Sequence, residues 1–160
     1  MAIYDIVTWH KSYSVNIPLI DSQHMELIHI TNKLYRNSLT GRNSSKDVFM
    51  EVLQGAINYV GYHFSTEEKI MERVNYPAII AHKNEHNDFV GEVLRVEEGF
   101  SKGGKYNPLN LVMYLKDWVL THIAVSDAAL GSYLVKLKHY GALNRIIVKV
   151  KTVEGRFVLE

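Results

Sequence analysis

Apolar residues recur at the spacing of an α-helix in four long segments, and this pattern constrains the fold more than any other feature of the sequence. The prolines and six of the ten glycines lie in or beside the breaks between the segments, and Asn107-Pro108 is a typical start for the last segment. Four helices joined by short connections predict an all-α fold, an antiparallel up-down four-helix bundle. The segments span about residues 19–38, 45–75, 77–98 and 108–140.

The two ends of the chain lack the helical period. Residues 1–18 are expected to form an extended N-terminal arm that packs on the bundle. Residues 145–160 alternate in polarity, and Glu154-Gly155 offers a turn, so a β-hairpin is one form this end could take. We therefore predict a bundle domain over residues 1–140 and a C-terminal extension over residues 141–160, packed on or beside the bundle.

Composition narrows the partners and the kinds of site. With 18 Lys and Arg against 17 Asp and Glu, the net charge of +1 gives no reason to expect nucleic acid or an anionic membrane. The absence of cysteine excludes disulfides, thiolate zinc sites and Cys-ligated iron–sulfur clusters. No apolar run approaches the ~20 residues of a membrane span, and the first ten residues do not resemble a signal peptide. A cytoplasmic location is the expectation.

Histidines fall on the apolar stripes, where core residues belong. Each predicted helix directs at least one metal-capable side chain toward the bundle axis. Burying such groups without partners would cost several kcal/mol, so a bound metal is the simplest explanation. The stripe positions are His24 in the first segment, His63 and Glu67 in the second, His82 and His86 in the third, and His122 in the fourth.

Spacing supports this interpretation. His63 and Glu67 are four residues apart, as are His82 and His86, so each pair lies on one helix face, one turn apart. Either pair alone could arise by chance, or could be a buried, hydrogen-bonded polar pair. Because both pairs are in phase with the apolar stripes, we favour a metal site.

The fourth segment offers His122 and Asp127, which are five residues apart. In a regular α-helix that spacing separates the two side chains by about 140°. A π-bulge would bring them to the same side, and such bulges are common at functional sites. We therefore predict a helix irregularity or a long reach near residues 123–127; a regular helix with Asp127 turned to solvent would remove Asp127 from the site.

The donor count indicates more than one metal ion. Five histidines and two carboxylates exceed the ligands that one zinc ion usually takes, and they suit two metals bridged by the carboxylates. Imidazole with carboxylate favours iron, zinc, copper or nickel over calcium or magnesium.

At these residues the chain resembles the hemerythrin family, and within it the bacterial hemerythrins. The resemblance covers about residues 5–135, whereas compact members end soon after the fourth helix and lack the extension found here. The matching stretches are Trp9 with Ile20–His24, then His63–Glu68, His82–His86, and Trp118 through Asp127.

The resemblance implies two iron ions in a non-haem centre that binds O2 reversibly, for storage, delivery or sequestration, and a protein that is not an enzyme. An oxo or hydroxo group would bridge the irons beside two carboxylates. One iron would be held by His82, His86 and His122 and the other by His24 and His63, with Glu67 and Asp127 bridging.

Reversible binding needs a dry pocket, which apolar neighbours of the ligands could wall. Ile28, Phe64, Trp118 and Val119 are our candidates for that wall. We expect Glu68 to face solvent and His10, His29 and His139 to lie outside the site.

Three other functions stay open at this stage. The chain could be an O2 or redox sensor whose extension transmits the signal. It could be a di-iron enzyme, such as an oxidase, a peroxidase or a nitric-oxide-handling protein. Simple iron or zinc storage is disfavoured because the site is discrete. The sequence indicates no particular protein partner.

Overall fold

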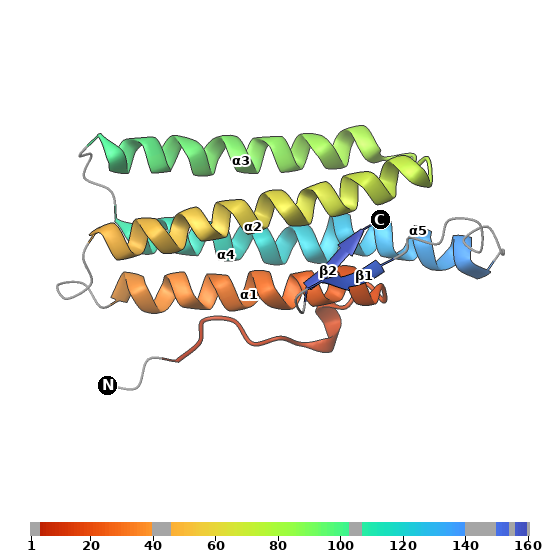
Figure 1. Cartoon of the computed structure of the whole chain (residues 1–160), viewed down its shortest axis with the longest axis horizontal. Helices are drawn as coiled ribbons and strands as arrows, with labels where there is room; N and C mark the ends of the chain where they lie inside the picture. The colour runs from red at the N-terminus through yellow and green to blue at the C-terminus, as the bar shows by residue number, and fades with distance from the viewer. Residues whose placement is uncertain (1–3, 40–45, 103–106, 140–149, 154–155, 160) are drawn as a thin grey trace.

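The computed structural model describes residues 4–39, 46–102, 107–139, 150–153 and 156–159, and within them the chain is a helical bundle (Figure 1). A π-helix, η2, joins the last two helices into one continuous rod. The helices are α1 (Pro18–Leu39), α2 (Lys46–Arg73), α3 (Ile79–Ser101), α4 (Pro108–His122), η2 (Ile123–Asp127) and α5 (Ala128–His139).

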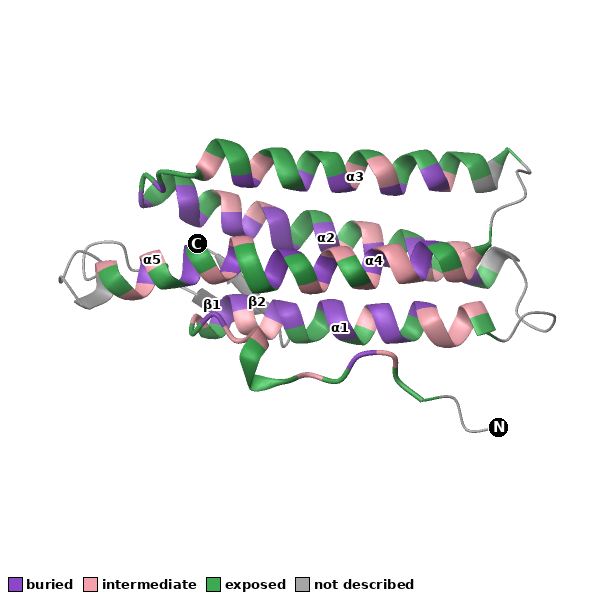
Figure 2. Ribbon diagram, turned by 180° about the vertical axis from the view of Figure 1, so that it is seen from behind, coloured by how far each residue is buried: buried purple, intermediate pink, exposed green. Residues whose placement is uncertain are grey.

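The helices run up, down, up and down around a common axis (Figure 1). Helix α1 packs against α2 and α4, while α3 packs against α2 and α4 on the opposite side. Their inward faces are buried and their outward faces exposed, as Figure 2 shows. The predicted antiparallel four-helix bundle is confirmed.

Local signals fix where helices begin and end. The Asn107 side chain accepts a hydrogen bond from the Leu109 N–H at 3.0 Å, and Pro108 is the first helical residue, so α4 starts where predicted. Helix α2 ends at Arg73, and Asn75, two residues later, has a left-handed φ of 50°. The Tyr76 N–H then bonds back to the Met71 carbonyl at 2.9 Å, a Schellman-type end that turns the chain toward α3.

Two apolar clusters fill the bundle, one toward each end. We call them the large and the small apolar cluster. The large cluster contains Leu27, Leu34, Phe49, Leu53, Ala56, Val60, Phe64, Phe89, Val93, Val96, Leu111, Val112, Leu115, Val119 and Ile123. The small cluster contains Val15, Ile20, Ile70, Met71, Val74, Tyr76, Leu130 and Leu134.

The N-terminal arm packs on the bundle. Asn32 in α1 holds it at Val7, accepting from the Val7 N–H at 3.0 Å and donating to the Val7 carbonyl at 2.7 Å. After the short 3-10 helix η1 (Lys11–Tyr13), Val15 passes directly over Gly131 of α5. A Cβ on residue 131 would lie 2.4 Å from the Val15 carbonyl oxygen, so only glycine permits this approach.

Near the C-terminus, β1 (Val150–Val153) and β2 (Arg156–Leu159) pair antiparallel. Val150 lies opposite Leu159 and Val153 opposite Arg156, which is the pairing of a hairpin. The expected Glu154-Gly155 turn lies outside the described residues. The boundary at residue 140 and the seating of the extension on the bundle stay predictions.

The stretch Pro108–Leu137 is long and apolar enough to cross a membrane by length and composition alone. It is more apolar than the sequence analysis allowed. However, its inward side includes buried Leu111 and Leu115 in the large cluster, together with buried His122 and Asp127. The inward side of this stretch therefore forms part of the bundle core.

Candidate metal centre

Seven ionisable side chains meet between the two apolar clusters. Each exposes at most 4% of its surface, and within the described residues they are all the buried His, Asp and Glu side chains. They come from α1, α2, α3, α4 and the π-helix η2. The seven are His24 (α1), His63 and Glu67 (α2), His82 and His86 (α3), His122 (α4) and Asp127 (η2).

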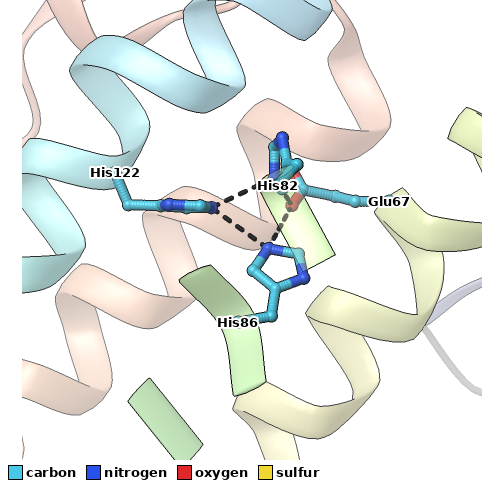
Figure 3. Close-up of side chains that lie close together, drawn as sticks. All are labelled: Glu67, His82, His86 and His122. Atoms are coloured by element: carbon cyan, nitrogen blue, oxygen red, sulfur yellow. Dashed lines mark hydrogen bonds and ion pairs between the residues drawn. The ribbon is translucent and has the colours of Figure 1, made fainter. Parts of the chain in front are cut away.

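The seven side chains form two overlapping groups, in each of which the potential ligand atoms lie within 4.8 Å of one another. Glu67 belongs to both. The structure thus brings together the side chains that the sequence singled out, and it divides the five histidines as the resemblance implied, with Asp127 in one of the two sets. The three-histidine set is Glu67, His82, His86 and His122 (Figure 3); the two-histidine set is His24, His63, Glu67 and Asp127.

In the three-histidine set, the Nε2 atoms converge. His122 Nε2 lies 3.0 Å from His86 Nε2 and 3.1 Å from His82 Nε2. Glu67 Oε2 lies 3.3 Å from His86 Nε2 and 3.4 Å from His82 Nε2. Nitrogen and oxygen donors therefore surround a single point, as in Figure 3.

Asp127 lies between the two sets. Its Oδ2 is 3.1 Å from His24 Nε2, and its Oδ1 is 3.1 Å from His122 Nε2. Glu67 also lies between the two sets. Its Oε2 is 3.3 Å from His86 Nε2 on one side and 3.8 Å from His63 Nε2 on the other, and its Oε1 is 4.0 Å from His24 Nε2. Both carboxylates could therefore contact a metal in either set.

Asp127 reaches this position because the helix is irregular there. The Ala128 N–H bonds to the carbonyl of Ile123, five residues earlier, which is the π-helical pattern. The extra residue in the turn brings the Asp127 side chain to the same side as His122. The predicted irregularity near residues 123–127 is confirmed.

The donor atoms fit a metal because they lack other partners. Six buried atoms have no hydrogen-bond partner, although some lie close to one another. Leaving such atoms unsatisfied costs ~1–3 kcal/mol each, and more when charged. Cations in the centre would satisfy the four carboxylate oxygens and His24 Nε2 together, whereas His24 Nδ1 lies on the other side of its ring. The atoms are Nδ1 and Nε2 of His24, both carboxylate oxygens of Glu67 and both of Asp127.

The tautomer of His63 follows from a short hydrogen-bond chain. Thr66 Oγ1 donates to the Tyr62 carbonyl, so the same oxygen accepts from Gln23 Nε2 at 3.1 Å. Gln23 Oε1 then accepts a hydrogen bond from His63 Nδ1–H at 3.0 Å. His63 Nε2 is left with its lone pair directed into the site, as a metal ligand requires.

Carboxylates accept hydrogen bonds from Nδ1 of two other rings and so select the same tautomer. Glu68 Oε1 lies 3.2 Å from His86 Nδ1, and Glu85 Oε2 lies 2.8 Å from His122 Nδ1. The expectation that Glu68 faces only solvent is wrong, because its side chain is 24% exposed and bonded to a ring of the site. Sequence reasoning gave no role to Gln23 or Glu85; their only signal was a place next to a histidine of the stripe.

The remaining histidines lie outside the site where described. His10 is exposed and caps η1 by accepting from the Ser12 N–H, and His29 is exposed on α1. The side chain of His139 lies outside the described part of the chain.

The electrostatics of the carboxylate pair are asymmetric. Burial, reinforced by Asp127, raises the pKa of Glu67 to about 8. Burial would also raise the pKa of Asp127, but contacts with His122, His24 and His82 outweigh it and hold that pKa well below its usual value. One proton on Glu67 therefore relieves the repulsion between the two carboxylates.

The histidines also differ in the direction of their pKa shifts. Burial and the neighbouring His24 lower the pKa of His63 well below its usual value, and burial and His122 lower the pKa of His86 to about 3. Burial also acts to lower the pKa of His82, but contacts with Asp127 and Glu67 outweigh it and raise that pKa to about 9. His63 and His86 are therefore neutral at pH 7, ready to bind a metal, whereas His82 must lose a proton.

A small cavity adjoins the centre. Its volume is about 10 Å³, which leaves room for roughly one water molecule. Of the predicted wall residues, Phe64, Trp118 and Val119 line it, but Ile28 does not. Leu27, one residue earlier on α1, takes that place.

Two aromatic side chains of the wall also pack on rings of the centre. Phe64 stacks on His86 with ring centroids 3.7 Å apart, and Trp118 stacks on His122 at 4.4 Å. These contacts restrict how the two imidazoles can rotate and place apolar surface beside them.

Comparison with known proteins agrees with this geometry. The family model described as the hemerythrin HHE cation binding domain matches residues 15–134. A bacteriohemerythrin of Methylococcus capsulatus is 29% identical over 130 residues, covering 81% of this chain and 97% of the relative. A bacteriohemerythrin of Campylobacter jejuni is 30% identical over 128 residues, covering 77% and 91%. A wild-type hemerythrin crystal structure superposes with a TM-score of 0.74 at 28% identity, covering 79% of this chain and 96% of the other.

Proposed function

This chain belongs to the hemerythrin family, and we propose that it binds O2 reversibly at a non-haem di-iron centre in its bundle, for oxygen storage, delivery or sequestration. One observation carries the proposal. Seven buried side chains form two potential ligand sets that share Glu67, and six of their polar atoms have no hydrogen-bond partner. Hemerythrins bind non-haem iron and O2, which favours iron over the other metals that these donors suit.

The proposed ligand assignment follows the two sets. In the two-histidine set, His24 and His63 would hold the second iron. Glu67 belongs to both sets, and Asp127 lies 3.1 Å from a histidine of each, so these carboxylates would bridge. His82, His86 and His122 would hold the first iron.

A bound iron pair supplies the electrons and the coordination position that reversible O2 binding needs. The chain supplies the enclosure. The cavity beside the centre admits about one small molecule, and Leu27, Phe64 and Val119 give it apolar walls. Such walls exclude the water and protons that would favour irreversible oxidation.

The same geometry favours binding over catalysis. Within the described residues, the buried His, Asp and Glu side chains are the seven proposed ligands themselves. No further buried side chain of these types is therefore available to move protons beside the cavity. We accordingly propose an O2-binding protein and not an enzyme, with O2 as its partner. The cytoplasmic location expected from the sequence stays part of the proposal.

The test is spectroscopic. The purified chain is loaded with ferrous iron without air, its iron content is measured, and visible spectra are recorded while it is cycled between air and argon. The proposal predicts about two irons per chain, from the ligand number, and a charge-transfer spectrum that appears and disappears over several cycles.

A matched pair of variants serves as control. Glu67→Gln, at the centre of the site, should lose the reversible spectrum, whereas Glu72→Gln, exposed on the same helix, should keep it. Permanent conversion to a ferric spectrum with consumption of peroxide would overturn the proposal in favour of an enzyme. One iron per chain or none would overturn the di-iron assignment.

A further inference from the structure

The outer nitrogens of two rings in the three-histidine set meet carboxylates at the edge of the bundle. Glu68 accepts from His86 Nδ1 at 3.2 Å and Glu85 accepts from His122 Nδ1 at 2.8 Å. Their side chains are 24% and 47% exposed. Each ring therefore lies between the interior of the site and a partly solvated negative charge.

Among the residues that the structure describes, no such charge lies behind the rings of the two-histidine set. His63 Nδ1 donates to Gln23, a neutral amide, and His24 Nδ1 has no hydrogen-bond partner. The two halves of the centre therefore differ in what lies beyond the rings as well as in the number of rings.

We propose that Glu68 and Glu85 are positioning residues that make the three-histidine set the tighter half of the centre, the one that takes up the first metal ion. A carboxylate that accepts a hydrogen bond from Nδ1–H holds the ring in the tautomer whose Nε2 lone pair faces the metal. The same hydrogen bond makes Nε2 more basic. Its negative charge also stabilises a cation beyond the ring. This inference rests on the metal binding in the proposed function, but not on O2 binding.

Each carboxylate is itself held in place. Glu85 Oε2 also accepts from Ser126 Oγ at 2.6 Å, which ties it to the π-helix, while Glu68 Oε2 pairs with Lys83 Nζ at 2.9 Å. Lys83 neutralises part of the charge on Glu68, and the Glu68 contact with its ring is the longer of the two. We therefore assign the larger effect to Glu85.

The first measurement uses the metal-free full chain at pH 7.5 and determines by ¹H–¹⁵N NMR which nitrogen of each imidazole carries the proton. The second titrates the same protein with Zn²⁺, recording the affinity by calorimetry and identifying the imidazole signals that shift at the first equivalent. The inference predicts protons on Nδ1 of His86 and His122. It also predicts that the rings of the three-histidine set respond to the first zinc ion.

Variants isolate the charge. Glu85→Gln and Glu68→Gln keep an acceptor oxygen but remove the charge, and each should weaken binding of the first zinc ion by about 10-fold or more. Glu72→Gln is the matched control, because Glu72 also pairs with Lys83, at 3.3 Å, and has no contact of this kind with a site ring. Gln23→Glu is the converse, and should tighten the second binding step by placing a charge behind His63.

The result that overturns the inference is equally direct. It fails if His86 and His122 carry their protons on Nε2, if both Gln variants bind the first zinc within twofold of the parent, or if the two-histidine set fills first. A parent chain that binds no zinc overturns metal binding as well. Zinc binding in the expected order without a reversible O2 spectrum overturns only the proposed function.

Discussion

The large apolar cluster and the metal centre are equally buried, yet they contribute to stability in opposite ways. Leu53 and Leu111 are 0% exposed, as are Glu67 and Asp127. Burial of the leucines is favourable on its own account. Burial of the carboxylates leaves four oxygen atoms without hydrogen-bond partners, which is unfavourable until a cation arrives. The large apolar cluster therefore drives folding, whereas the metal centre depends on that cluster and on bound metal.

Metal loading should produce the largest effect on this comparison. An ion at 1,000 times its dissociation constant stabilises the folded state by about 4 kcal/mol, so two ions should raise the thermal midpoint by many degrees. The check is a thermal melt of the loaded protein with and without a chelator. Identical midpoints would show that the centre does not depend on metal.

Truncating the apolar cluster should cost nearly as much, but without reference to metal. Leu53→Ala removes a fully buried side chain of the large cluster and should lower the free energy of unfolding by about 2–5 kcal/mol. Chemical denaturation should give the same loss in metal-free and metal-loaded protein. A loss confined to the loaded state would mean that the two regions are not independent.

Substitution of a central carboxylate should affect stability only when metal is bound. In metal-free protein at pH 7, Glu67 is protonated because its pKa is about 8, so Glu67→Gln replaces a neutral carboxyl by a neutral amide and should change the free energy of unfolding by no more than about 1 kcal/mol. In loaded protein it should remove much of the metal-dependent stability. Glu72→Gln, on the same helix but exposed, should stay within about 0.5 kcal/mol of the parent in both states. A strong destabilisation of the metal-free Glu67 variant would contradict the comparison.

Metal binding should also be linked to protons. Glu67, with a pKa of about 8, and His82, with a pKa of about 9, hold protons at pH 7, whereas the lowered pKa values of His63 and His86 leave those rings neutral. Zinc binding at pH 7 should therefore release about two protons. The apparent affinity should rise with pH and level off above about pH 9, where both groups are already deprotonated.

Calorimetry in two buffers of different ionisation enthalpy measures this proton release. Release that increases with pH, or no release at pH 7, would contradict the assignment of the two raised pKa values.

The cavity wall should give the smallest and most local effect. Val119→Thr places a hydroxyl at the cavity and should speed conversion of the oxygenated protein to the ferric form severalfold. Ile28→Thr is the matched control, since Ile28 is buried but does not line the cavity. Stopped-flow spectra in air would measure both rates, and equal acceleration by both variants would remove Val119 from the proposed pocket wall.

The helical period was enough to predict the bundle and the side chains that meet inside it, because the period assigns each residue to a face. The five-residue spacing of His122 and Asp127 was enough to predict an irregularity or a long reach near residues 123–127, because a regular helix would hold the two side chains about 140° apart. The helical period does not predict which of two adjacent buried residues lines a cavity. Leu27 and Ile28 are both buried, and which of them lines the cavity depends on how α1 is rotated in the bundle.

Hydrogen-bond partners across helices were beyond the sequence for a related reason. Glu85 is largely exposed, so no hydrophobic pattern marks it, and its contact with His122 depends on the axial offset between α3 and α4. Glu68 follows Glu67 directly and was assigned to solvent because consecutive residues diverge by about 100° on a helix. That divergence carries it out of the centre, but only as far as the back of His86.

The π-helix makes the chain tolerant of a lost residue in one short stretch. Deleting exposed Ala124 would leave the histidine and the aspartate four residues apart, and a regular α-helix holds such a pair within about 40° of each other. The aspartate would therefore still face His122, and the helix beyond it would keep its orientation. A codon lost from a regular turn of α2 would instead rotate every later residue of that helix by about 100°. Loss of a codon at residue 124 should therefore do less damage than the same loss inside α2.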